Sequence, residues 1–180
     1  MNRKNQPIER LALLLDQADA DFAAIQERQA ARMQCRAGCS ACCRARLSIT
    51  RVEEAFLRDG LAGLSKDSRA ELWARTREKD REMCPALDGD GRCGIYPFRP
   101  LICRTYGVPL RHRHEVPMVN PPVIDVCDLN FAETSLKTLP PADVYDQTTA
   151  VESLEAIDRE YCDDNDLPPG ERIPIASLLR

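Results

Sequence analysis

The arrangement of the cysteines constrains the fold of this chain more than any other feature. The sequence has 180 residues and nine cysteines, most of which fall into two groups. The first group is Cys35, Cys39, Cys42 and Cys43, and the second is Cys84, Cys93 and Cys103. Cysteines spaced three or four positions apart in a loop that contains glycine can converge on one metal ion or cluster, because the backbone there bends sharply. Both groups are therefore predicted to bind metal.

The two remaining cysteines differ from each other. Cys127 lies beside aspartates after a short apolar stretch and is predicted to be an eighth ligand, whereas Cys162 stands alone in an acidic segment and is predicted to be a partly buried helical thiol. Eight thiolates could fill two four-thiolate sites. Cys42 and Cys43 are adjacent and would form a strained ring on one small ion. They therefore either bind different atoms or divide into one ligand and one free thiol.

Composition argues against disulfides and against a membrane protein. Cysteines make up 5% of the residues, less than the ~8–10% of small disulfide-bonded proteins. Their number, nine, is odd, so they cannot all pair within the chain. The longest apolar run near the N-terminus, Leu11 to Leu15, ends at Asp16 and falls far short of the ~20 residues of a membrane span. We expect a single cytoplasmic domain over residues 1–180 with reduced thiols.

Charge is divided unevenly along the chain, whose net charge is −4. Residues 1–120 carry 21 basic and 16 acidic side chains (+5), whereas residues 121–180 carry 4 basic and 13 acidic ones (−9). The absence of a long basic run argues against nucleic-acid binding. The acidic helix predicted over 142–163 is instead a candidate surface for a protein partner.

Hydrophobic spacing predicts a mainly α domain. Helices are expected at 7–33, 51–59, 65–82 and 142–163. Thr50 and Glu53 have the spacing of a capping box, Gly60 is expected to end the second helix, and Trp73 is expected in the core. Between the helices, the segment Asp88-Gly-Asp-Gly91 predicts the turn of a short β-hairpin. The expected fold is a small helical domain around an irregular cysteine-rich loop and this hairpin, organised by metal.

Cationic and imidazole side chains near the cysteines are further candidates. Arg44, Arg99 and Arg104 each lie within four residues of a cysteine and are predicted to compensate the negative charge of a thiolate-bound cofactor. The alternative is that they are ordinary surface arginines of an arginine-rich chain. His112 and His114 alternate on a predicted extended segment and could add imidazole ligands, with a solvated loop as the alternative.

The residues from Cys84 onward resemble a known family. In order, they contain Cys84-Pro-Ala-Leu, Cys93-Gly-Ile-Tyr, Arg99-Pro and Cys103-Arg-Thr-Tyr. Together with the first cysteine group, this block resembles the YkgJ-type CxxCxxCC family, which is regarded as zinc- or iron-chelating. The resemblance covers residues 35–107. It implies metal ligation by the seven grouped cysteines and structural roles for a second set, Tyr96, Arg99, Pro100, Arg104 and Tyr106.

This chain departs from the family name at one point, since three residues separate Cys35 from Cys39 where the name implies two. Some longer relatives are flagellin lysine methylases whose cysteine set is associated with an iron–sulfur cluster, and we expect this chain to be too short to add their other parts.

The function predicted from these observations is metal chelation. An iron–sulfur cluster, with 4Fe–4S favoured, is preferred over zinc because the cysteine spacings are unequal and seven or eight thiolates are available, whereas zinc sites more often show two Cys-x2-Cys pairs. One alternative is an iron–sulfur enzyme in electron or methyl-group transfer. Another is a protein-interaction module in which zinc only stabilises the fold.

Overall fold

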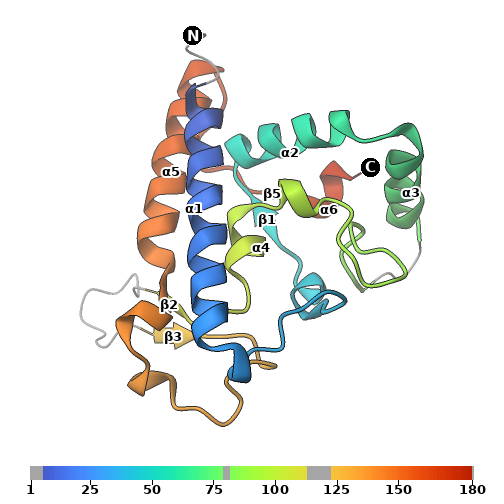
Figure 1. Ribbon diagram of the computed structural model, residues 1–180. Coiled ribbons are helices and arrows are strands. Elements are labelled where there is room, and N and C mark those ends of the chain that lie inside the picture. The colour runs from blue at the N-terminus through green and yellow to red at the C-terminus, as the bar shows by residue number, and fades with distance from the viewer. Residues whose placement is uncertain (1–5, 79–81, 113–122, 180) are drawn as a thin grey trace.

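The computed structural model describes residues 6–78, 82–112 and 123–179, and α-helices together with short 3-10 turns account for 56% of these residues (Figure 1). The prediction of a mainly α fold is confirmed. The helices are α1 (Gln6–Arg28), α2 (Arg51–Gly63), α3 (Lys66–Thr76), α4 (Leu101–Thr105), α5 (Gln147–Asp164) and α6 (Ile175–Leu178). The strands are β1 (Ser48–Ile49), β2 (Leu110–His112), β3 (Val123–Asp125), β4 (Tyr145–Asp146) and β5 (Ile173–Pro174).

Helices α1 and α5 lie side by side along one edge of the molecule (Figure 1). The apolar stripe predicted for the first helix is buried at Leu11, Leu15, Ala18 and Ile25, because those positions recur at helical spacing on one face. The helix ends at Arg28, and a single 3-10 turn, η2 (Ala30–Arg32), extends the coiled chain almost to the predicted end. The stripe therefore serves the core of the chain itself.

Helix α2 begins where the sequence predicts and ends later. The Thr50 side chain accepts a hydrogen bond from the Glu53 N–H, and Glu53 accepts one from the Thr50 N–H, which completes the capping box. The prediction that Gly60 ends the helix is wrong, since α2 continues to Gly63. A β-carbon on Gly60 would overlap the Phe98 ring, so glycine is required here for close packing rather than for a stop.

Helix α3 is shorter than predicted, and fewer of its residues are buried. Ser65 caps it by accepting a hydrogen bond from the Ser68 N–H at 3.1 Å, but the helix ends at Thr76 instead of near 82. Leu72 is buried, whereas Trp73 is 46% exposed, so the expectation of a core tryptophan is wrong. The helix lies at the outer edge of the molecule, where only a narrow stripe of it meets other elements (Figure 1).

The sheets of the described chain are small. Strand β2 pairs antiparallel with β3 and parallel with β4, and β1 pairs antiparallel with β5. The predicted hairpin is reduced to an isolated antiparallel bridge between Leu87 and Cys93, closed by a hydrogen bond from the Asp88 N–H to the Arg92 carbonyl at 2.9 Å. Short pairings of this kind fix loops in place without forming a separate layer.

Two hydrophobic clusters form the core. The first lies between α1, α5 and α4, and the second lies between α2, α3, β5 and α6. Helix α2 contributes to both, through Val52 and Leu57. Cys35 packs against the first cluster, whereas Cys84, Cys93 and Cys103 pack against the second. The cysteine groups therefore rest on different parts of the scaffold.

None of the helices in the described part of the chain combines the length and the apolar composition needed to cross a lipid bilayer.

Candidate metal centre

Eight cysteines line one cavity of about 1040 Å³. They are the eight that the sequence assigned to metal, namely Cys35, Cys39, Cys42, Cys43, Cys84, Cys93, Cys103 and Cys127. All eight are half-buried free thiols. Cys162 is fully buried within α5 and does not line the cavity. The structure thus gathers residues that are up to 92 positions apart in sequence, from 35 to 127.

The first cysteine group lies on a loop and a single 3-10 turn. Gly38 takes a φ of +87°, a conformation that glycine adopts without steric cost, and it turns the chain between Cys35 and Cys39. The turn η3 (Ala41–Arg44) then carries Cys42 and Cys43 and is closed by a hydrogen bond from the Cys43 N–H to the Ser40 carbonyl at 2.9 Å. Successive residues of a 3-10 turn project about 120° apart, since there are three residues per turn.

The second group is tied directly to the first. The Cys84 N–H donates to the Cys43 carbonyl at 2.7 Å, and the bridge between Leu87 and Cys93 brings Cys93 back towards Cys84. At the tip of this loop, a β-carbon on Gly91 would lie 3.1 Å from the Gly38 carbonyl oxygen, so the two loops pass close together. These contacts hold Cys43, Cys84 and Cys93 on one side of the cavity.

Cys103 reaches the cavity from α4, whose start is fixed by a buried carboxylate. Glu53 is 3% exposed and accepts a hydrogen bond from the Leu101 N–H at 2.9 Å, which occupies one of the amide groups at the start of α4. Burial raises the pKa of Glu53, against the lowering effect of these amide hydrogen bonds. The capping box of α2 therefore also orients the helix that carries Cys103.

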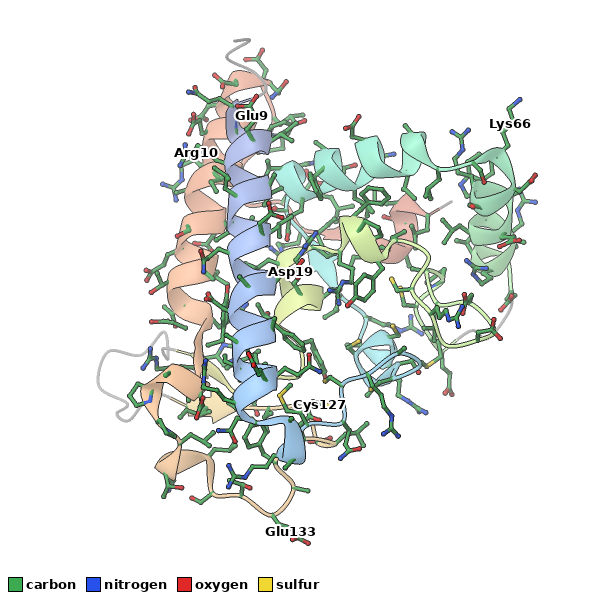
Figure 2. All side chains as sticks on the ribbon, viewed as in Figure 1. Glu9, Arg10, Asp19, Lys66, Cys127 and Glu133 are labelled. Atoms are coloured by element: carbon green, nitrogen blue, oxygen red, sulfur yellow. The ribbon has the colours of Figure 1, made fainter. Side chains whose placement is uncertain are left out.

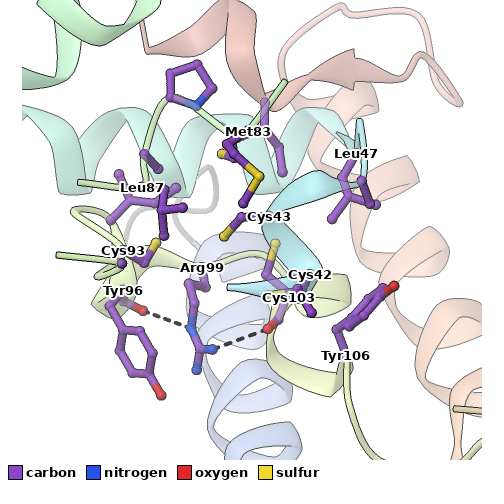
Figure 3. A pocket seen from close by; sticks show the side chains of 18 of the residues that line it. Cys42, Cys43, Leu47, Met83, Leu87, Cys93, Tyr96, Arg99, Cys103 and Tyr106 are labelled. Carbon is purple, nitrogen blue, oxygen red and sulfur yellow. Dashed lines mark hydrogen bonds between the residues drawn. The ribbon is translucent and has the colours of Figure 1, made fainter. Parts of the chain in front are cut away.

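Arg99 places a positive charge at the cavity wall (Figure 3). Its guanidinium stacks on the Tyr96 ring at 3.7 Å and donates to the Cys103 carbonyl at 3.2 Å. Asp19 on α1 lies 3.6 Å away and forms an ion pair with it. Figure 3 shows this guanidinium hydrogen bonded to the Cys103 carbonyl.

The other two predicted arginines lie outside the cavity lining. Arg44 is exposed on η3. Arg104 is 6% exposed, pairs with Asp19, and donates to the Arg99 carbonyl at 2.7 Å. It therefore holds the backbone at Arg99 rather than facing the thiols. Four arginines line the cavity besides Arg99, and they are Arg36, Arg46, Arg75 and Arg92.

Cys35 occupies a closely fitted place. The amide of Asn130, which is 2% exposed, donates to the Cys35 sulfur at 3.2 Å and to the Gly107 carbonyl at 2.6 Å. Its Oδ1 accepts from the Gln34 N–H at 2.7 Å. Gly107 has a φ of +120°, and a β-carbon there would lie 2.7 Å from the Cys35 sulfur. The sulfur is thus fixed between a glycine and a buried amide.

Burial and the neighbouring thiols shift the pKa values of several cavity cysteines. Burial raises the pKa of Cys35, the Asn130 hydrogen bond opposes this, and the charges of Cys39, Cys127 and Cys42 add to the rise. Burial also raises the pKa of Cys103, with contributions from Cys42, Cys84 and Cys93. Cys42 has a lowered pKa because Cys43 hydrogen bonds to it and Arg99 lies nearby, although burial opposes this. Cys42 therefore adjoins both groups of cysteines.

The imidazoles are not part of this lining. His112 ends β2, where it pairs with Val123, and is absent from the cavity wall. His114 lies outside the described residues. Within the described residues, no group of three or more His, Cys, Asp or Glu side chains is arranged around a single metal ion, and the thiols are instead distributed along the cavity wall.

Several residues of the site were not predicted from the sequence. Asn130 and Gly107 contact Cys35 from distant positions, and Arg75 joins the wall from α3 while donating to the Pro85 carbonyl at 2.9 Å. No local motif marks Asn130 or Arg75. Gly107, whose φ is positive, directly follows the Cys103-Arg-Thr-Tyr element. A glycine at that position was the one signal in the sequence that could have pointed to this part of the site.

A helical scaffold that gathers eight thiols around one cavity defines a cysteine-cluster protein. The model of the CxxCxxCC family, described as a putative zinc- or iron-chelating domain, matches residues 34–120, and the chain is similar to this family over that segment. The predicted resemblance is therefore confirmed. Cys127 and Asn130 lie outside the matched segment. Comparisons with curated proteins and with solved structures gave no match.

Proposed function

We propose that this chain binds an iron–sulfur cluster, with 4Fe–4S favoured, through the cysteine thiolates of the cavity. The observation that carries the proposal is that eight thiols line a single cavity of about 1040 Å³. Thiolates are the ligands that iron–sulfur clusters and zinc share, so the donor set suits the metals of the family. The number of thiols that line the cavity favours a polynuclear cluster over a single ion.

The charge of the wall supports the same proposal. Thiolate-bound clusters carry net negative charge, and cations or hydrogen-bond donors around the sulfurs stabilise that charge and tune the reduction potential. Among the described lining residues five are arginines, whereas two, Glu78 and Glu82, are carboxylates. The Arg99 guanidinium, beside the Cys103 carbonyl, and the Asn130 amide, on the Cys35 sulfur, would both supply such stabilisation.

The decisive experiment is anaerobic purification followed by elemental analysis, sulfide determination and a visible absorption spectrum. We expect iron and acid-labile sulfide in stoichiometric amounts, with sulfur-to-iron charge-transfer absorption. The Cys162→Ser variant is the matched control, because Cys162 is the one cysteine away from the cavity, and it should keep the full iron content. Stoichiometric zinc without iron or sulfide would overturn the cluster and favour a zinc-stabilised module.

A further inference from the structure

We propose that the cavity holds two separate four-thiolate metal centres, one formed by Cys43, Cys84, Cys93 and Cys103 and the other by Cys35, Cys39, Cys42 and Cys127. The inference deepens the proposed function, since it concerns how many centres the same thiols form and which thiol belongs to each. It also adds a ligand, Cys127, that lies beyond the family segment of 34–120.

The scaffold already separates the two sets. Cys84, Cys93 and Cys103 pack against the hydrophobic cluster of α2, α3 and α6, whereas Cys35 packs against the cluster of α1 and α5. Figure 2 places Cys127 near the C-terminal end of α1, on the same side as the hydrophobic cluster against which Cys35 packs. The two sets therefore meet the cavity from different walls.

Three hydrogen bonds join the Cys127 segment to the Cys35 segment. The Phe131 N–H donates to the Arg32 carbonyl at 2.9 Å, the Gln34 N–H donates to Asn130 at 2.7 Å, and Asn130 donates to the Cys35 sulfur at 3.2 Å. The turn that carries Cys127 is closed by the Asn130 N–H on the Cys127 carbonyl at 2.8 Å. Asn130 thus orients both ends of this set.

The adjacent pair marks the boundary between the centres. The Cys84 N–H donates to the Cys43 carbonyl at 2.7 Å, which places Cys43 beside the second cysteine group, and we assign its thiol to that centre. The Cys42 and Cys43 thiols lie in contact on η3, but two adjacent cysteines would form a strained ring on a single ion, so we assign them to different centres. Cys42 then completes the set of Cys35, Cys39 and Cys127, which gives four thiolates to each centre.

The test counts bound metal in single-cysteine variants and identifies the protected thiols. Wild-type protein is reconstituted anaerobically with ferrous iron and sulfide, and in parallel with zinc alone, and is then alkylated and examined by mass spectrometry. Cys127→Ser should retain about half of the wild-type metal. Its Cys35, Cys39 and Cys42 should become reactive to alkylation, whereas Cys43, Cys84, Cys93 and Cys103 stay protected.

The complementary variants complete the test. Cys84→Ser should lose the other half of the metal and expose the opposite set, the double variant should bind almost none, and Cys162→Ser should match wild type. If Cys127→Ser does not fold, as judged by circular dichroism, Asn130→Ala leaves all cysteines in place and should expose the same three thiols. Two sites measured with zinc would support the inference even if iron–sulfur binding fails. A folded variant that keeps all its metal, or in which every thiol becomes reactive together, would overturn it.

Discussion

At the scale of single residues, Gly107 has the strictest requirement in the site. It combines a φ of +120° with a position where a β-carbon would lie 2.7 Å from the Cys35 sulfur. Residues other than glycine are rarely found at such angles, and each costs about 1–3 kcal/mol of backbone strain. The contact with sulfur adds to that cost. A side chain at this position would therefore strain the backbone and also displace the Cys35 thiol from its place in the site.

We predict that Gly107→Ala destabilises the protein by more than about 2 kcal/mol and displaces the Cys35 thiol. The free energy of unfolding from urea denaturation and the metal content per chain would measure the two effects. Gly170→Ala is the matched control, because Gly170 also has a positive φ, of +78°, but nothing lies within 4 Å of the added carbon. Equal stability of the two variants would contradict the packing explanation.

The residues that the sequence could and could not predict differ in the range of their contacts. The eight cavity cysteines were recognisable because their spacing is itself the signal. Asn130 was not recognisable, since its contact with Cys35 spans 95 positions and depends on how β3 and the following turn fold back onto α1. Arg44 and Arg104 were chosen for proximity in sequence, which says nothing about the direction in which a side chain points.

At the scale of elements, the starts of α1, α2 and α3 were predicted better than their ends, whereas α5 begins at Gln147 instead of the predicted 142 and ends one residue after the predicted 163. The caps of α2 and α3 depend on residues within three positions, so Thr50 and Ser65 could be identified directly. Gly60, where the sequence predicted the end of α2, instead packs against Phe98, which lies 38 positions later in the chain. A glycine that admits a neighbouring ring cannot be distinguished by sequence from a glycine that ends a helix.

A pair of substitutions in α2 tests this interpretation. Gly63→Ala adds a carbon that meets nothing within 4 Å and should be neutral or stabilising by up to about 1 kcal/mol, because alanine favours helix. Gly60→Ala gains the same propensity but forces the Phe98 ring to move, at a cost of about 1–3 kcal/mol. We therefore expect Gly60→Ala to have the lower thermal midpoint, and the reverse order would show that Gly60 is not needed for packing.

The start of α5 should respond to pH. Asp146 caps this helix by accepting from the Thr149 N–H at 3.2 Å and lies 3.2 Å from Arg111. Partial burial acts to raise the pKa of Asp146, but the Thr149 hydrogen bond and the Arg111 charge outweigh it and lower the pKa. A lowered pKa in the folded state stabilises the protein above the ordinary carboxyl pKa, and this contribution is lost as pH falls through the lowered value.

We predict that Asp146→Ala lowers the free energy of unfolding by about 1 kcal/mol at pH 7, the usual effect of losing an N-cap. The difference from wild type should shrink as the pH is taken below about 4, where the carboxylate becomes protonated. Urea denaturation at several pH values measures this. Asp146→Asn keeps a capping oxygen and should lose less at pH 7, and a difference that stays constant with pH would contradict the role of the charge.

At the scale of the whole molecule, the two hydrophobic clusters share α2, and we propose that the chain folds as a single unit over residues 1–180. The thiol array lies where loops, rather than long helices, supply the wall. Metal binding should then add order mainly to those loops, because ligand binding contributes to folding where the site is not otherwise held together.

We predict that removing the metal with a chelator increases amide hydrogen exchange in residues 35–43 and 84–103 while α1 and α5 keep their protection. Leu11, Leu15, Leu154 and Ile157 of these helices belong to one hydrophobic cluster, and none of the four lines the cavity. Hydrogen–deuterium exchange with mass spectrometry measures the pattern. Equal loss of protection in α1 and α5 would show that metal holds the entire fold together.

The exposed tryptophan, which the sequence placed in the core, has a practical consequence. Trp73 is the single tryptophan of the chain and lies on α3, two residues before the cavity residue Arg75. A coloured cluster absorbs light at the wavelengths where indole emits, so energy transfer should quench the emission of this one fluorophore when the cavity is filled. With the proposed cluster bound, the emission of Trp73 should therefore report what fraction of the protein carries it.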